Sequence, residues 1–157
     1  MKENKMKWKV LIISLVIVYA VASIGSLFTS AGVNSEWYET IKPSITPPSI
    51  VFPIVWNVLF LLIAISLYLA WTCAKNKEDK IRIGVVFGIN FILNILWSVF
   101  YFGMKNPSLA FINIILLTAS IIIMIRVTYK INKTSSYLLW PYLIWVLFAI
   151  VLNWLSI

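Results

Sequence analysis

Long apolar stretches alternate with short polar connections along nearly the whole chain. Each stretch approaches or exceeds the roughly 20 residues that an α-helix needs to cross the hydrocarbon core of a membrane. The five qualifying segments are Val10–Phe28, Ser49–Trp71, Ile81–Phe102, Ser108–Val127 and Tyr137–Ile157. This pattern predicts an all-α membrane protein, a bundle of five transmembrane helices that forms a single domain over residues 1–157. The last three connections are short, so the helices that they join should be antiparallel.

The connection between the first two spans differs from the others. Residues 37–57 read WYETIKPSITPPSIVFPIVWN. Its four prolines are Pro43, Pro47, Pro48 and Pro53. Proline fixes φ and disfavours a helix at the residue before it, so residues 42–48 should be extended or turned. Pro48 or Pro53 then suits the first turn of the second membrane helix.

Aromatic rings are interleaved with these prolines, which gives the long connection two possible roles. A stiff, non-helical segment that carries flat rings suits a lid over a pocket in the bundle. An interfacial anchor fits equally well, because Trp and Tyr collect at membrane surfaces. The candidate lid residues are Trp37, Tyr38, Pro43, Pro47 and Pro48.

Composition and charge agree with a membrane protein and indicate its orientation. Hydrophobic residues make up 62% of the chain and charged residues 11%, which is too apolar for a soluble domain. The net charge of +8 is concentrated before the first span, between the second and third, and around the turn between the fourth and fifth. Only Lys42 and Lys105 fall on the other side. The positive-inside rule therefore predicts a cytoplasmic N-terminus and an outside C-terminus, and it explains the charge better than nucleic-acid binding does.

Several kinds of chemistry are disfavoured by what the spans lack. No acidic, lysine or histidine side chain lies in the middle of a span, which argues against ion-coupled transport. Neither a nucleophile with a base nor a pair of carboxylates is present for hydrolysis. With no histidine and the single Cys73, we expect no metal site and no required cofactor.

Polar and aromatic residues fall on single faces of several spans when each residue turns the helix by about 100°. These faces comprise Tyr19, Ser23 and Ser26 on the first span; Pro53, Trp56, Asn57, Phe60, Ala64 and Trp71 on the second; Asn90, Asn94, Trp97 and Tyr101 on the third; and Tyr142, Trp145, Ala149 and Asn153 on the fifth. Because lipid offers amides no partner, these faces should point into the bundle. Interhelical hydrogen bonding alone would explain the amides, whereas their aromatic company favours a small-molecule cavity.

A separate feature of the third span is the GxxxG spacing of Gly84 and Gly88. Glycines at this spacing let two helix backbones approach closely. The motif lies well around the helix from the face of Asn90 and Asn94. It predicts a homodimer interface through the third helix.

Three ordered motifs resemble those of the TspO/MBR family, which comprises translocator proteins and bacterial tryptophan-rich sensory proteins. The motif residues are Trp37-Tyr38, Lys42-Pro43, Pro47-Pro48, Phe52, Trp56 and Leu59; Leu93-Asn94, Trp97-Ser98 and Phe100-Tyr101; and Pro141-Tyr142, Trp145, Phe148-Ala149 and Leu152-Asn153. The resemblance covers nearly the whole chain. It implies five transmembrane helices around a pocket that the first loop closes.

The resemblance also implies binding of tetrapyrroles such as protoporphyrin IX, and of isoquinoline and benzodiazepine-type ligands. Family pocket positions correspond here to Trp56, Asn94, Trp97, Tyr142, Trp145 and Ala149, and the same helix faces add Asn90 and Tyr101. We therefore expect a receptor-like protein for porphyrin sensing, sequestration or transport in a bacterial cell membrane. The alternative is an enzyme that degrades porphyrin with light and oxygen, for which Trp56 and Trp145 are the candidate catalytic residues.

Overall fold

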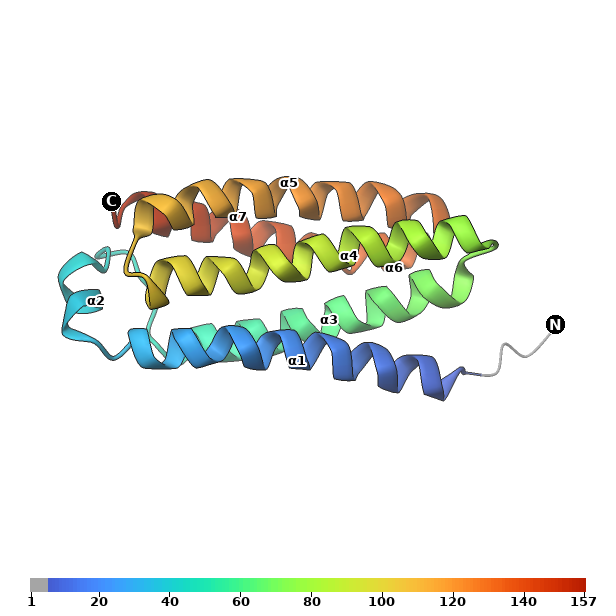
Figure 1. The fold of residues 1–157 in the computed structure, drawn as a ribbon, viewed down its shortest axis with the longest axis horizontal. Coiled ribbons are helices and arrows are strands. Elements are labelled where there is room, and N and C mark those ends of the chain that lie inside the picture. Colours follow the sequence, from blue (N-terminus) through green and yellow to red (C-terminus); the bar gives the residue numbers. More distant parts are fainter. Residues whose placement is uncertain (1–5) are drawn as a thin grey trace.

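The computed structural model describes residues 6–157, which form helices and their connections (Figure 1). The elements are α1 (Trp8–Gly32), α2 (Glu36–Ile41), α3 (Val51–Cys73), α4 (Lys77–Ser98), the π-helix η1 (Val99–Gly103), α5 (Pro107–Ile131), α6 (Lys133–Tyr137) and α7 (Trp140–Trp154). Five helical segments in this range are long and apolar enough to span a membrane, with η1 continuing α4 and α6 preceding α7. The expected all-α, five-span architecture is confirmed.

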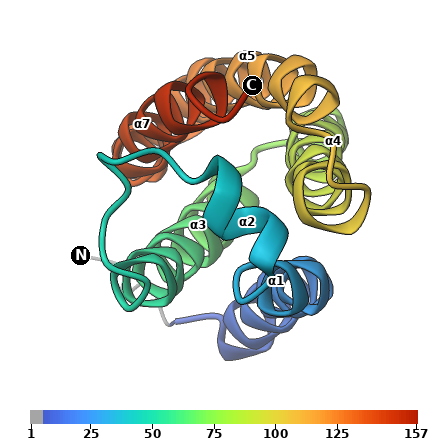
Figure 2. The same cartoon turned by 90° about the vertical axis from the view of Figure 1, so that its left-hand side faces the viewer.

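The long helices form a ring when the bundle is viewed along its axis (Figure 2). α1 packs against both α3 and α4, α4 packs along α5, and α5 packs along α7. α3 and α7 complete the ring. The interior is apolar, with Ile63, Phe87, Ile121 and Met124 almost entirely buried.

Two of the long helices, α4 and α5, begin before the expected apolar segments because polar side chains cap them. Asn76 accepts a hydrogen bond from the backbone N–H of Asp79 at 2.7 Å, so α4 begins one turn before the apolar run. Asn106 caps α5 in the same way at 2.9 Å, and Pro107 follows at the first helical position, where its missing N–H costs nothing. Hydropathy marks the membrane-buried part of a helix, whereas capping marks where it begins.

The long connection differs in one part from the non-helical segment that the prolines suggested. Residues 42–50 are extended or turned, and Pro53 lies in the first turn of α3, as expected. Residues 36–41, however, form the short helix α2, which the sequence analysis missed. Ser35 caps it by accepting from the N–H of Tyr38 at 3.2 Å, and acidic residues occupy its first turn.

The predicted inward face of the first span is wrong. Tyr19, Ser23 and Ser26 are exposed on α1, and Gly25 and Gly32 face the bundle instead. Each serine donates its hydroxyl to a carbonyl of its own helix, at 2.8 Å in both cases, so neither needs an interhelical partner. Ser14 and Val18 complete the buried face of α1, and Phe102 lies directly against Gly32.

Candidate ligand-binding site

A chain of hydrogen bonds around Tyr142 links three helices of the bundle. Asn94 of α4 donates its Nδ2 to the phenol oxygen of Tyr142 on α7 at 3.1 Å, and that hydroxyl donates to Oδ1 of Asn90 at 3.3 Å. Asn90 in turn donates to Oγ of Ser120 on α5 at 2.9 Å. All four residues are buried, so these polar groups satisfy one another inside an apolar bundle.

A second polar cluster lies further along the same helices, toward the C-terminus of the chain. The indole N–H of Trp97 donates to Oδ1 of Asn153 at 3.0 Å, and the hydroxyl of Tyr101 donates to Oγ of Ser156 at 2.8 Å. The rings of Trp97 and Tyr101 stack, with their centroids 5.1 Å apart and an interplanar angle of 24°. These contacts tie the end of α4 and η1 to the end of the chain.

Aromatic side chains of α3 meet α7 beside the first cluster. The centroids of Trp56 and Tyr142 are 6.1 Å apart in an edge-to-face arrangement, and those of Phe52 and Trp145 are 5.9 Å apart. Trp56, Trp145 and Ala149 are half-buried and pack against the hydrophobic core. The side of α3 that carries Trp56 therefore faces the helix that carries Tyr142 and Trp145.

The eight predicted ligand-binding residues thus lie on α3, α4, η1 and α7 of one bundle, buried or half-buried. Three other residues that the sequence analysis placed on the same α3 face do not join them, and the first is Pro53, which is exposed in the first turn of the helix. Asn57 is exposed and donates to the carbonyl oxygen of Pro53 on its own helix at 2.8 Å. Trp71 is also exposed, and the Nζ of Lys80 lies 5.9 Å from the centre of its ring. All three belong to the outer part of α3.

The short helix α2 lies across one end of the bundle (Figure 2). Tyr38 is buried, and its ring centroid is 5.5 Å from that of Phe102 and 6.4 Å from that of Tyr101. The ring of Trp37 is 6.0 Å from Tyr101. These rings contact the bundle, as a covering segment requires. Of the three candidate lid prolines, Pro43 and Pro47 are half-buried and Pro48 is exposed.

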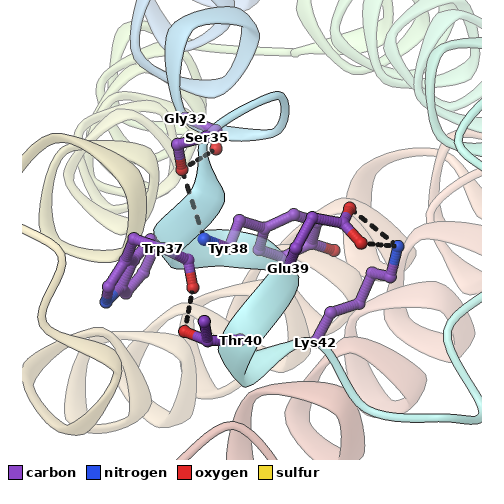
Figure 3. A network of polar contacts seen from close by, with 7 residues as sticks. All are labelled: Gly32, Ser35, Trp37, Tyr38, Glu39, Thr40 and Lys42. Atoms are coloured by element: carbon purple, nitrogen blue, oxygen red, sulfur yellow. Dashed lines mark hydrogen bonds and ion pairs between the residues drawn. The ribbon is translucent and has the colours of Figure 1, made fainter.

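Local polar contacts hold α2 in shape (Figure 3). The side chain of Lys42 forms an ion pair with Glu39 at 2.9 Å, and its Nζ lies 6.0 Å from the centre of the Tyr38 ring. Burial raises the pKa of the Tyr38 phenol to about 12, with smaller contributions from Tyr101 and the Glu39 carboxylate. Tyr38 therefore stays neutral at physiological pH.

The glycines of the GxxxG motif border an open groove. Gly84 is exposed and Gly88 half-buried, and a Cβ added to either would meet no atom within 4 Å. They line a groove of about 410 Å³, together with residues such as Ile13 of α1 and Trp71 of α3. The groove leaves this face of α4 accessible to another apolar surface, and the homodimer stays a prediction.

The site offers neutral hydrogen-bonding groups and flat rings. Within residues 6–157, no three or more His, Cys, Asp or Glu side chains gather closely enough to hold a metal ion. Amides and hydroxyls can orient a polar edge of a ligand, and the indoles can stack on an apolar ring system. The two clefts described in the structure lie elsewhere, one between α4 and α5 and the other beside α1, α3 and α4, so a flat ligand would have to part the side chains of this site.

Two polar residues of α5 that bond to α4 are absent from the predicted site. Asn113 is buried and donates to the backbone carbonyl of Leu93 on α4 at 2.9 Å. Ser120 accepts from Asn90, as described above. The two residues are seven positions apart, which is nearly two full turns, so they share a face of α5. This seven-residue spacing could have predicted a polar face on α5 from the sequence.

Comparison with known proteins agrees with this architecture. The sequence model of the TspO/MBR family matches residues 13–156. The chain belongs to the TspO/MBR family. It is 38% identical over 144 residues to the tryptophan-rich protein TspO of Archaeoglobus fulgidus, covering 91% of this chain and 92% of that protein.

Other relatives of this TspO/MBR family member come from distant organisms. The tryptophan-rich protein TspO of Chlorobaculum tepidum is 38% identical, with 85% of each chain covered. The human translocator protein is 28% identical, over 83% of this chain and 78% of that protein. The family assignment and the five membrane-spanning helices together identify a multi-pass integral membrane protein.

Proposed function

We propose that this TspO/MBR family member binds a flat tetrapyrrole such as protoporphyrin IX, or an isoquinoline or benzodiazepine-type ligand, between α3, α4 and α7. Binding would serve porphyrin sensing, sequestration or transport. The observation that carries the proposal is the hydrogen-bonded chain of Asn94, Tyr142 and Asn90, flanked by the rings of Trp56 and Trp145. Neutral donors beside indole rings are what a large, flat, mostly apolar ligand requires.

The polar groups of the site are already paired, so a ligand would have to exchange its own contacts for theirs. A net hydrogen bond inside a protein is worth about 1 kcal/mol, so exchanging one amide contact for a ligand contact costs little. Each aromatic pair contributes about 0.5–1.5 kcal/mol beyond the area that it buries. Ring stacking on several indoles therefore decides the affinity, and the amides orient the ligand.

Titration of protoporphyrin IX against tryptophan fluorescence tests this proposal. We expect quenching at micromolar porphyrin, and binding weakened at least tenfold by Trp56→Phe combined with Trp145→Phe. The matched control replaces the exposed Trp140 and Trp154 by Phe, which should leave the affinity unchanged. Equal quenching curves for the two double variants would contradict the proposed site.

The same titration under light distinguishes binding from catalysed breakdown. If the protein only binds porphyrin, the absorbance of bound porphyrin should decay under light no faster than that of free porphyrin. An enzyme would accelerate oxygen-dependent loss of the porphyrin spectrum and stop doing so in Trp56→Phe or Trp145→Phe. We propose binding as the primary function, because the polar side chains of the site are neutral amides and hydroxyls and include no carboxylate or imidazole base.

We also propose that the protein lies in a bacterial cell membrane with its N-terminus in the cytoplasm and its C-terminus outside. The start of α1, the α3–α4 connection and the α5–α6 connection lie at one end of the bundle (Figure 1). The described basic residues cluster there, with Lys42 and Lys105 as exceptions. Reporter fusions at the C-terminus should be active only when the reporter functions outside the cytoplasm.

A further inference from the structure

A small cleft lined by both apolar and charged side chains opens between α4 and α5. Its volume is about 140 Å³, roughly ten times the room that one water molecule needs. The lining residues are Asp79, Arg82, Ile123, Arg126, Val127, Lys130 and Ile131. Three of the four charged side chains are cationic, and they come from the first turns of α4 and the last turns of α5. The cleft therefore attracts anions at the edge of two apolar spans.

The cations of this cleft are poorly neutralised by the protein itself. Arg126 and Lys130 are four residues apart on α5, so like charges lie on one face and repel. Within residues 6–157, neither of them forms an ion pair. Arg82 of α4 pairs only with Glu78, in an exposed contact along its own helix that an external anion can replace at little cost.

The rest of the lining points to a lipid as the source of the anion. Ile123, Val127 and Ile131 form an apolar wall that continues into the membrane-spanning part of α5. Basic pockets between the ends of transmembrane helices suit anionic lipid headgroups. A free phosphate ion would use the cations and gain nothing from the apolar wall.

We propose that this cleft binds the phosphate of an anionic phospholipid. Arg82 and Arg126 donate from planar guanidinium groups, which match phosphate oxygens in pairs, and Lys130 adds a third cation. The first part of an acyl chain lies along Ile123. Asp79 lines the same cleft and opposes the anion, so its charge limits the affinity. This site is separate from the proposed porphyrin site and does not depend on it.

Native mass spectrometry of the full chain in a neutral detergent tests the proposal, with dioleoylphosphatidylglycerol and dioleoylphosphatidylcholine as probes. We expect at least tenfold tighter binding of phosphatidylglycerol. Arg126→Gln combined with Lys130→Gln should weaken it about tenfold. The matched control, Lys77→Gln with Lys133→Gln, removes the same charge nearby but outside the cleft and should leave the affinity unchanged.

Asp79→Asn is an independent variant that should change the affinity for phosphatidylglycerol in the opposite direction. Removing this charge should tighten phosphatidylglycerol binding several-fold, an effect that general damage to the fold would not produce. Unchanged or weaker binding in Asp79→Asn would overturn the proposal, and so would equal loss in the two double variants. Inorganic phosphate that binds as tightly as phosphatidylglycerol in isothermal titration would refute the lipid assignment. So would an Arg126→Gln and Lys130→Gln variant that changes the monomer–dimer ratio and leaves phosphatidylglycerol binding unchanged.

Discussion

At the residue scale, the polar groups of this protein are matched to one another almost completely inside an apolar bundle. Asn90, Asn94 and Tyr142 each have a hydrogen-bond partner on another helix. An unpaired amide in hydrocarbon would cost on the order of several kcal/mol, which is the free energy of moving it out of water without a partner. Outside the spans, in the connection between α2 and α3, the buried hydroxyl of Thr46 has no hydrogen-bond partner among the described residues.

Replacing Thr46 by Val should stabilise the protein by about 1 kcal/mol. Valine has nearly the same shape and removes a hydroxyl that burial leaves unsatisfied. Thermal unfolding in detergent measures the effect. Thr128→Val is the control, since that buried hydroxyl donates to the carbonyl of Met124 at 2.8 Å and its loss should not stabilise. A lower melting temperature for Thr46→Val would show that its hydroxyl is satisfied in solution.

Tyr142→Phe should destabilise the protein by about 1–3 kcal/mol and weaken porphyrin binding. The substitution leaves Nδ2 of Asn94 and Oδ1 of Asn90 without their shared partner in a buried site. Unfolding in detergent and fluorescence titration measure the two effects. Tyr137→Phe removes a hydroxyl from an exposed ring and should change neither quantity. Identical behaviour of the two variants would mean that the chain of hydrogen bonds carries no energy.

The stability contributed by Tyr38 should be lost at alkaline pH. Its pKa is raised from 10.0 to about 12 in the folded protein, so the unfolded chain loses this proton first. The contribution is complete below pH 10 and disappears as the pH rises toward 12. Comparing melting temperatures of the wild type and Tyr38→Phe across this range separates the contribution of Tyr38 ionisation from that of other titrating groups. A difference that stays constant from pH 9 to the alkaline limit, about 12, would contradict it.

At the element scale, helix packing depends on where small residues allow close approach. Gly32 at the end of α1 lies directly against the ring and Cβ of Phe102 in η1, with no room for a Cβ. Gly84 in α4 faces open space instead. The two glycines thus have opposite roles, although both lie in long apolar spans.

Alanine substitution should separate these roles. Gly32→Ala forces Phe102 and the η1 backbone apart and should destabilise by about 1–3 kcal/mol, as overpacking does. In the monomer, Gly84→Ala meets no neighbour and should stabilise by about 0.5–1 kcal/mol through its higher helix propensity. Thermal unfolding of both variants in one detergent is the measurement. Similar melting temperatures would refute the close packing at Gly32.

At the scale of the whole molecule, one face of α4, which carries Gly84 and Gly88, borders a groove that no part of the described chain fills. The groove of about 410 Å³ between α1, α3 and α4 would be filled by lipid or by a second copy. We expect the second copy, because glycines at this spacing admit another helix backbone. Gly88→Leu should reduce dimer cross-linking in membranes several-fold, whereas Ile144→Leu on the exposed face of α7 should not. Unchanged cross-linking in Gly88→Leu would place the interface elsewhere.

The sequence by itself determined the membrane class, the number of spans and the inward faces of α4 and α7. Asparagine and tyrosine in an apolar span can be satisfied only inside the bundle, so their helical spacing is informative. It did not determine the inward face of α1, the helix α2 or the polar face of α5. Lipid and the protein interior are equally apolar, so hydrophobicity cannot tell which side of α1 packs, and serines that bond their own helix are tolerated on either side. Only the tertiary structure decided that Gly32 meets Phe102, that Tyr38 covers Tyr101, and that Ser120 completes the chain of hydrogen bonds from Tyr142.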